Sequence, residues 1–228
     1  LNMHGQATLL ELAESVEDLD TELFENIVMV HDSGLKVLLA PPRPEQADII
    51  IRDNPDAVAS ILEKVRSNYD FIVVDTSSHL DETLASLLDI ATRIVLVTPP
   101  TLPGIKNARL MLDLFDQLGY APEKACLVVN RAVDERQRRQ GGISAEKIQS
   151  YLKRPVREKI PLVEERIILN AVNKGVPVIA AERDTNKPPT KQYIALADAL
   201  MDELMGDLEE EADEKSEKSK PGLRLFGR

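Results

Sequence analysis

The sequence predicts an α/β fold: a doubly wound, mostly parallel sheet with helices on both faces. Short apolar runs rich in Val, Ile and Leu recur along the chain without alternating with polar residues, which is typical of strands buried on both faces. Amphipathic segments separate these runs, and strands that alternate with helices favour right-handed crossover connections. The predicted strands are residues 35–40, 71–75, 93–98, 125–130 and 177–181.

The segments between the first runs predict two helices. Asn54 followed by Pro55 is a favourable helix start, and apolar residues then recur at i, i+3, i+4 and i+7. The residues at these positions are Val58, Ile61, Leu62 and Val65. Residues 82–91 predict a shorter helix with three leucines on one side.

The second half of the chain predicts three more helices. Residues 103–120 form an amphipathic segment with Gly119 as its C-cap. Its inward positions are Ile105, Ala108, Leu112 and Phe115. A strand that ends at Ile160 leads through a short turn into a helix over residues 164–173, and residues 189–206 predict the last helix.

Composition excludes several classes of protein. The net charge of −11 disfavours nucleic acid as a partner, because phosphate binding needs clustered Lys and Arg. The single cysteine, Cys126, cannot form an internal disulfide, which fits a reducing cytosol. No apolar run reaches about 18 residues, so no membrane span is predicted. The chain starts with Leu1 in a segment typical of the inside of a domain, so we expect an N-terminally truncated protein.

Asp75 ends the apolar run of residues 71–74. An aspartate after a buried strand can hold Mg²⁺ through water in a nucleotide site, but Asp also begins turns and caps helices. A phosphate site also needs a glycine-rich loop such as GxxxxGK[ST], and no such motif occurs in the 228 residues. The residues alone therefore leave open whether Asp75 holds Mg²⁺ in a nucleotide site or has a structural role in a turn or helix cap.

Polar residues also end two other predicted strands. Thr98 ends one, and Asn130, followed by Arg131, ends another. Ligands of open α/β sheets bind beyond the carboxyl ends of the strands, so these side chains are candidates for a binding site. The amide of Asn130 offers a donor and an acceptor, which suits a purine edge, although a loop-capping role explains it equally well. A short loop after Pro161 could lie against a flat ligand or be a plain turn.

Four stretches resemble the MinD/ParA class of P-loop ATPases. They are VVDTSSHLDE, LVTPPTLPGIKNARLMLDLF, LVVNR and IPLVEERIILNAVNKGVPVI, which occur in that class in the same order and at similar spacing. The resemblance is closest to the pilus-assembly branch, the CpaE/TadZ-type proteins, which residues 34–50 also resemble. It covers about residues 1–200 and implies a P-loop NTPase-like fold.

The resemblance implies site residues and cofactors. Asp75 is similar to the Walker B aspartate of the class, which acts on Mg²⁺ through a water molecule. Asn130 is similar to the Asn that reads adenine in ATP, and Arg131 lies beside it. The loop that flanks adenine in the class is matched by Pro161, Leu162 and Val163.

The resemblance also implies partners and a cellular role. Proteins of the class hydrolyse ATP slowly as a sandwich dimer and use ATP to switch between dimer and monomer. These states localise a division septum, a plasmid or a pilus machine. The chain is therefore expected to form a homodimer, to bind pilus-assembly or division proteins, and to lie in the cytoplasm at the inner face of the plasma membrane. Its acidic charge makes plasmid partition the weaker alternative.

One part of the class pattern is missing. The deviant Walker A loop, with its two lysines and Thr or Ser, does not occur in residues 1–228. Without those lysines nothing neutralises the developing phosphate charge. We therefore expect the parent protein to be an ATPase and this chain alone to be inactive, so no catalytic residue is assigned within it. In proteins of the class, the strand that precedes this loop lies in the middle of the sheet. A chain that lacks that strand would leave the strands on either side of it without a partner.

The chain is predicted to contain three parts. Residues 1–205 form the ATPase-like domain, residues 206–220 a charged flexible linker, and residues 221–228 a short amphipathic tail. The tail resembles the membrane-targeting ends of MinD proteins, and its predicted membrane-contacting residues are Leu223, Arg224, Leu225 and Phe226.

Three functions remain open from the sequence. The first is a positioning ATPase of which residues 1–228 are a part. The second is a scaffold of the same fold that does not hydrolyse ATP. The third is a metabolic enzyme on the same P-loop architecture, which would need substrate-binding residues after Asp75, and the stretch TSSHLDE offers no evident carboxylate clamp.

Overall fold

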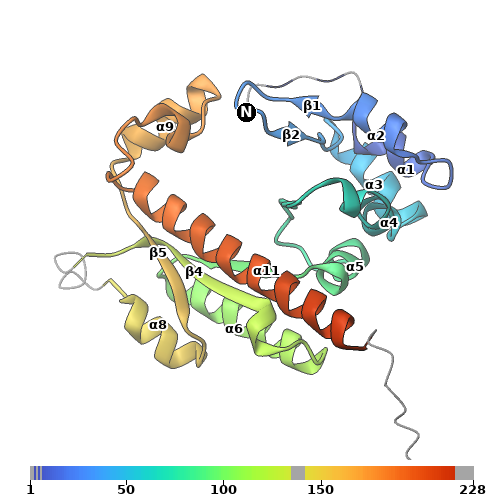
Figure 1. The fold of residues 1–228 in the computed structure, drawn as a ribbon. Coiled ribbons are helices and arrows are strands. Elements are labelled where there is room, and N and C mark those ends of the chain that lie inside the picture. Colours follow the sequence, from blue (N-terminus) through green and yellow to red (C-terminus); the bar gives the residue numbers. More distant parts are fainter. Residues whose placement is uncertain (1–2, 4, 6, 135–141, 219–228) are drawn as a thin grey trace, which may run out of the picture. The chain divides into compact units, whose positions relative to one another are not determined.

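The computed structural model describes residues 3, 5, 7–134 and 142–218 (Figure 1). These residues fall into two compact units, which we call the N-terminal unit (residues 2–91) and the C-terminal unit (residues 92–228). Each unit has an apolar core of its own. The domain boundary at residue 205 stays a prediction.

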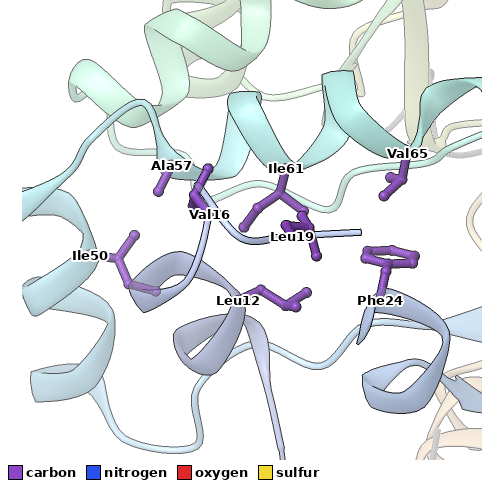
Figure 2. Packing of buried hydrophobic residues seen from close by; sticks show 8 residues of the cluster. All are labelled: Leu12, Val16, Leu19, Phe24, Ile50, Ala57, Ile61 and Val65. Carbon is purple, nitrogen blue, oxygen red and sulfur yellow. The ribbon is translucent and has the colours of Figure 1, made fainter. Parts of the chain in front are cut away.

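The N-terminal unit consists mainly of helices around one core. Its helices are α1 (Leu9–Glu14), α2 (Thr21–Ile27), α3 (Pro44–Asp53), α4 (Ala57–Val65), the 3-10 helix η1 (Arg66–Asn68) and α5 (Glu82–Ile90). Strands β1 (Met29–Val30) and β2 (Lys36–Val37) pair antiparallel. Figure 2 shows the buried core residues, which are Leu12, Val16, Leu19, Phe24, Ile50, Ala57, Ile61 and Val65. Helices α4 and α5 confirm the two helices predicted in this region.

Two predicted strands of this unit are wrong. Of residues 35–40, only Lys36–Val37 are a strand, and they pair in an antiparallel hairpin. Residues 71–75 form no strand, and the four apolar side chains among them are exposed, Val73 by 93%. A strand needs a neighbour that satisfies its backbone donors and acceptors. No strand in the described parts of the chain pairs with residues 71–75.

The C-terminal unit is built on a parallel sheet in the order β3-β4-β5. The strands are β3 (Ile94–Thr98), β4 (Ala125–Ala132) and β5 (Val156–Pro161). Its helices are α6 (Leu102–Gln117), η2 (Pro122–Lys124), α8 (Ala145–Leu152), α9 (Glu165–Lys174), α10 (Val178–Ala181) and α11 (Thr190–Lys218). Helix α11 lies across one face of the sheet and α6 on the other (Figure 1). The predicted α/β fold with a parallel sheet is confirmed.

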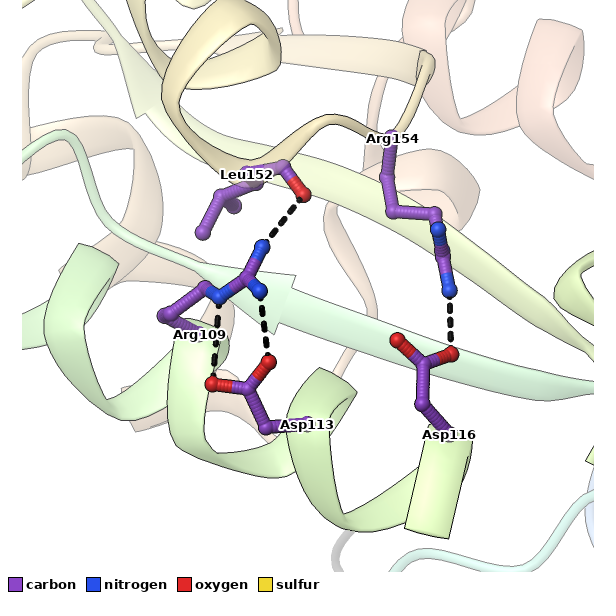
Figure 3. Close-up of polar contacts among 5 residues, drawn as sticks. All are labelled: Arg109, Asp113, Asp116, Leu152 and Arg154. Carbon is purple, nitrogen blue, oxygen red and sulfur yellow. Dashed lines mark hydrogen bonds and ion pairs between the residues drawn. The ribbon is translucent and has the colours of Figure 1, made fainter. Parts of the chain in front are cut away.

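Helix α6 agrees closely with its prediction. Ile105, Ala108, Leu112 and Phe115 are all buried, and Gly119 follows the helix with φ +77°. One hydrogen bond and one ion pair join α6 to the end of α8 and the residues after it (Figure 3). Arg109 pairs with Asp113 at 2.6 Å and donates to the carbonyl of Leu152 at 3.2 Å, while Asp116 pairs with Arg154.

Two further predictions differ from the structure at the end of the chain. The sequence predicts a strand over residues 177–181, but Val178–Ala181 form α10, because a short apolar run does not distinguish a strand from a helical turn. Helix α11 runs to Lys218, through most of the predicted linker over residues 206–220. That stretch is rich in Glu and Lys, which are good helix formers. The predicted membrane residues Leu223, Arg224, Leu225 and Phe226 lie outside the described residues. In the part of the chain that the structure describes, none of the helices has the length and apolar character needed to span a bilayer.

Candidate functional site

The carboxyl ends of the three parallel strands lie side by side in the C-terminal unit. Thr98 of β3 is the register partner of Val129, and Asn130 of β4 is the partner of Ile160. Pro161 ends β5 one step beyond Ile160. The sequence predicts the polar residues Thr98 and Asn130 at the ends of two of these strands, and the register brings both ends to one edge of the sheet.

The end of β4 has an irregular backbone. The register with β5 shifts between Asn130 and Ala132, and the intervening Arg131 has φ +58°. The backbone amide of Arg131 donates a hydrogen bond to Oδ1 of Asn130 at 2.8 Å. A left-handed conformation costs a residue other than glycine about 1–2 kcal/mol, and such strain is concentrated at functional sites. Nothing in the sequence pattern indicates this conformation.

The loop after β5 is attached to the end of β4. The backbone amide of Leu162 donates to the carbonyl of Ala132 at 3.0 Å. Leu162 is exposed and Val163 half-buried, and α9 begins two residues later at Glu165. The structure therefore brings together Asn130, Arg131 and residues 161–163.

These residues fit a purine base. Among the residues that the structure describes, the amide of Asn130 makes one hydrogen bond, so its Nδ2 donors and a second lone pair on Oδ1 can contact the polar edge of a base. Leu162 and Val163 offer apolar side chains in the loop that is attached to the end of β4, and ligand sites combine apolar walls with a few polar groups. The site can thus recognise a flat heteroaromatic ring, which is a binding task rather than a catalytic one.

The end of β3 is organised differently. Thr98 is buried, and its hydroxyl donates to the carbonyl of Pro99 at 3.3 Å. Thr101 caps α6 by accepting a hydrogen bond from the amide of Gly104 at 3.3 Å. The geometry gives these residues a structural role in starting α6. The close packing of Pro99 on Gly104 escaped the sequence analysis, although the string PPTLPG contains both residues.

Asp75 belongs to the N-terminal unit. Its carboxylate is exposed, and the following turn is held by hydrogen bonds between Ser77 and His79. Nucleotide sites hold Mg²⁺ with one or two carboxylates together with substrate phosphates. The exposed carboxylate of Asp75 has the chemistry of one such ligand. Within the described residues, no group of three or more His, Cys, Asp or Glu side chains could hold a metal ion.

A shallow groove lies between α9 and α10. It has a volume of about 210 Å³, and its lining includes Ala171, Lys174, Val178 and Glu182. None of the predicted site residues lines it. It is smaller than the 300–1,000 Å³ that is typical of small-molecule pockets.

Sequence comparison finds relatives among septum site-determining proteins. The chain is 25% identical over 125 residues to MinD of Thermotoga maritima, covering 55% of this chain and 45% of that protein. It is 24% identical over 147 residues to MinD of a Synechocystis species, covering 64% of this chain and 53% of that protein. The chain thus spans about half the length of the curated relatives it matches. No protein-family model matches it.

Solved structures share the fold. A ParA family ATPase from Chlorobium tepidum superposes with a TM-score of 0.72 at 22% identity, covering 86% of this chain and 76% of that one. MinD of Aquifex aeolicus superposes with a TM-score of 0.68 at 22% identity, covering 88% of this chain and 77% of that one. A third structure is the septum site-determining protein MinD of Pyrococcus horikoshii, complexed with Mg-ADP. It superposes with a TM-score of 0.68 at 18% identity, covering 87% of this chain and 75% of that one. The relatives and the shared fold together support the resemblance to the MinD/ParA class.

Proposed function

We propose that residues 1–228 are part of a MinD/ParA-type ATPase that positions a cellular machine. The observation that carries this proposal is the junction of Asn130 and Arg131 beside Leu162, at the carboxyl edge of a parallel sheet. Related proteins of similar fold are septum site-determining proteins, and one of them was solved with Mg-ADP.

The proposed roles follow from the chemistry of the residues. Asn130 contacts the adenine edge, Leu162 and Val163 cover the base, and Pro161 turns the chain toward it. Arg131 holds the end of β4 in the conformation that presents Asn130. Asp75 orients a water molecule toward Mg²⁺, and bound Mg²⁺ neutralises phosphate charge.

We propose that a strand and a phosphate-binding loop outside residues 1–228 complete the site. Strand β3 pairs only with β4 in the described chain, and its Val95 and Val97 are 41% and 53% exposed. These valines are register partners of Cys126 and Val128, which α11 covers. An exposed apolar edge strand is a site for further strand pairing. The aligned part covers 75–77% of the similar solved chains, so they contain additional length.

The machine that is positioned is either the division septum or a pilus-assembly complex. The sequence relatives favour the septum, whereas residues 34–50 resemble the pilus-assembly branch. In either case we propose a homodimer, contact with division or pilus-assembly proteins, and membrane contact through Leu223, Arg224, Leu225 and Phe226. A fluorescent fusion of the complete gene product separates the two roles, because the first collects around the division site and the second at the pilus machine.

A second candidate is a scaffold of the same fold that does not hydrolyse ATP. The absence of a GxxxxGK[ST] motif from residues 1–228 favours it. The complete gene product distinguishes the two: Mg²⁺-dependent ATP turnover that Asp75→Ala abolishes supports the ATPase. Nucleotide binding without turnover supports the scaffold.

The nucleotide site is tested by binding of a fluorescent ADP derivative to residues 1–228 and to the complete gene product. Asn130→Ala should weaken binding about 3- to 10-fold, as expected for one or two lost hydrogen bonds. Asn107→Ala, which changes an exposed Asn on α6, is the matched control and should have no effect. Equal affinities of the two variants would remove Asn130 from the site.

A further inference from the structure

Helix α11 covers part of its face of the parallel sheet and leaves β3 exposed. Leu196 and Leu200 of α11 pack on a cluster in β4 and β5 that consists of Cys126, Val128 and Ile160. Val95 and Val97 of β3 lie on the same face, because they are the register partners of the two β4 residues, yet both valines are exposed. Among the residues that the structure describes, the cover of this face therefore stops at β4.

The flank of α11 that faces β3 is apolar and exposed as well. Successive residues of an α-helix are rotated by about 100°, so Tyr193, Ala197 and Met201 form one stripe along the helix. All three are exposed. The opposite flank faces the outer side of the edge strand β5, because the carbonyl of Ala199 accepts a hydrogen bond from Arg157 of β5 at 3.3 Å. The stripe therefore borders the exposed valines of β3.

The two exposed groups together form a surface that has room for one helix. We call it the α11–β3 surface, and it consists of Val95, Val97, Tyr193, Ala197 and Met201. Strands lie about 4.8 Å apart and packed helices about 8–10 Å apart, so one helix covers about two strands. Helix α11 covers β4 and β5, so the next helix would cover β3 and the strand beside it. Two copies of the chain paired through β3 would leave both β3 strands uncovered on this face, so a second copy does not fill the surface.

The handedness of the chain selects the segment that fits. The connection from β3 through α6 to β4 runs toward β5, and its helix lies on the face opposite α11 (Figure 1). Connections between parallel strands are right-handed, so a connection that runs the other way, away from β3, places its helix on the face of α11. A strand outside residues 1–228 cannot lead directly into β3, because α5 precedes β3 in the chain. The helix after such a strand therefore leads away from β3 and lies on the α11–β3 surface.

We infer that the complete gene product contains an amphipathic helix that follows the strand beside β3 and packs on the α11–β3 surface. This inference rests on the proposed function, which places that strand outside residues 1–228, and it adds the segment that covers the free flank of α11. The helix presents an apolar stripe to Val95, Val97 and Met201 and polar residues to solvent. The similar solved chains have the length for such a unit, because the aligned part covers 75–77% of them.

The test measures thiol labelling on two sides of α11 in the complete gene product. Ala197→Cys places a thiol in the middle of the stripe. Asp198→Cys is the matched control, because this exposed residue lies midway between Leu196 and Leu200 in sequence and so on the side of the helix away from the sheet. The thiol at residue 197 should react with iodoacetamide at least about 10-fold more slowly than the thiol at residue 198, and both should react alike in urea. Mass spectrometry of the labelled peptides separates these thiols from Cys126.

A photocrosslinking amino acid in place of Tyr193 identifies the segment that covers the surface. A crosslink to a peptide outside residues 1–228 supports the inference. A crosslink to residues 2–91 or to a second copy overturns it, as does equal labelling of the two thiols in the folded protein. Binding of ADP to the same protein is measured separately. Bound ADP with equal labelling overturns the inference and leaves the proposed nucleotide site intact, whereas protection of residue 197 without ADP binding supports the inference and removes that site.

Discussion

Pro99 packs directly against Gly104. A Cβ atom on Gly104 would lie 2.7 Å from Cγ and 2.8 Å from Cδ of the Pro99 ring, and 3.1 Å from the Pro99 carbonyl oxygen. Real Cβ atoms essentially never approach another atom as closely as the two ring distances, so a side chain at this position would force the Pro99 ring or the backbone to shift. The contact fixes the connection from β3 into α6, next to the carboxyl edge of the sheet.

Gly104→Ala should therefore destabilise the protein. Alanine is the better helix former by about 1 kcal/mol, but overpacking of a close contact costs about 1–3 kcal/mol. Urea unfolding measures the difference. Gly206→Ala is the matched control, because Gly206 lies within α11 and a Cβ there would meet nothing within 4 Å outside the backbone of its own helix. The control should be stabilised, and a stabilised Gly104→Ala would contradict the packing argument.

The parts of the fold that were predicted correctly are those with both local signal and tertiary support. The four inward positions of α6 follow from spacing alone, because a helix satisfies its own backbone and needs only an apolar face to pack. The runs at β3 and β4 became strands because each has a partner in the sheet.

The wrong strand prediction at residues 71–75 has a physical cause. Residues 71–74 are a continuous apolar run like the one in β4, yet they are exposed and form no strand, because strand formation depends on a neighbouring strand that sequence composition does not report. At the candidate site, the sequence predicts roles for Asn130 and residues 161–163, and the structure brings the backbone of these segments together. It could not reveal the left-handed Arg131, since nothing in an Asn-Arg pair demands that conformation.

The conformation of Arg131 yields a second prediction. Arg131→Gly removes the cost of a side chain in the left-handed region but increases the flexibility of the unfolded chain, so it should change stability by less than about 1 kcal/mol. Arg131→Val places a β-branched residue where it is a strong outlier and should destabilise by about 1–2 kcal/mol or more. Both values are measured by urea unfolding. Equal stability of the two variants would show that φ is relaxed in solution.

Cys126 should react slowly in the folded protein. The thiol is buried under α11, and burial, followed by the nearby Glu203 carboxylate, raises its pKa, against the opposing effect of Arg157 and Arg93. Only the thiolate is a nucleophile, so alkylation by iodoacetamide should be slow at neutral pH and accelerate in urea.

A substitution at Glu203 separates the effect of burial on the pKa of Cys126 from the effect of the neighbouring carboxylate. Glu203→Gln removes the neighbouring negative charge, so the pKa of Cys126 should fall and alkylation should accelerate at a given pH. Asp202→Asn changes the adjacent residue of α11 and serves as the control. If the two variants react alike, burial alone determines the reactivity of the thiol.

Glu146 should make stability depend on pH in an acidic range. It lies in the first turn of α8, and hydrogen bonds from its own backbone amide and from Ser144, together with Lys159 at 3.3 Å, lower its pKa from 4.5 to about 2. A carboxylate whose pKa is lower in the folded state stabilises the fold above its unfolded pKa. That contribution should be present above about pH 4.5 and disappear as the pH falls to about 2.

Glu146→Gln lacks this contribution, so its urea midpoint should lie below that of the wild type at pH 6. The difference between the two proteins should shrink below pH 4.5 and vanish near pH 2, because the wild-type carboxylate is then protonated as well. Taking the difference cancels the titration of all other carboxylates. Glu63→Gln, an exposed change on α4, should show no such trend. A constant difference across this range would mean that Glu146 acts through packing or helix propensity and not through its charge.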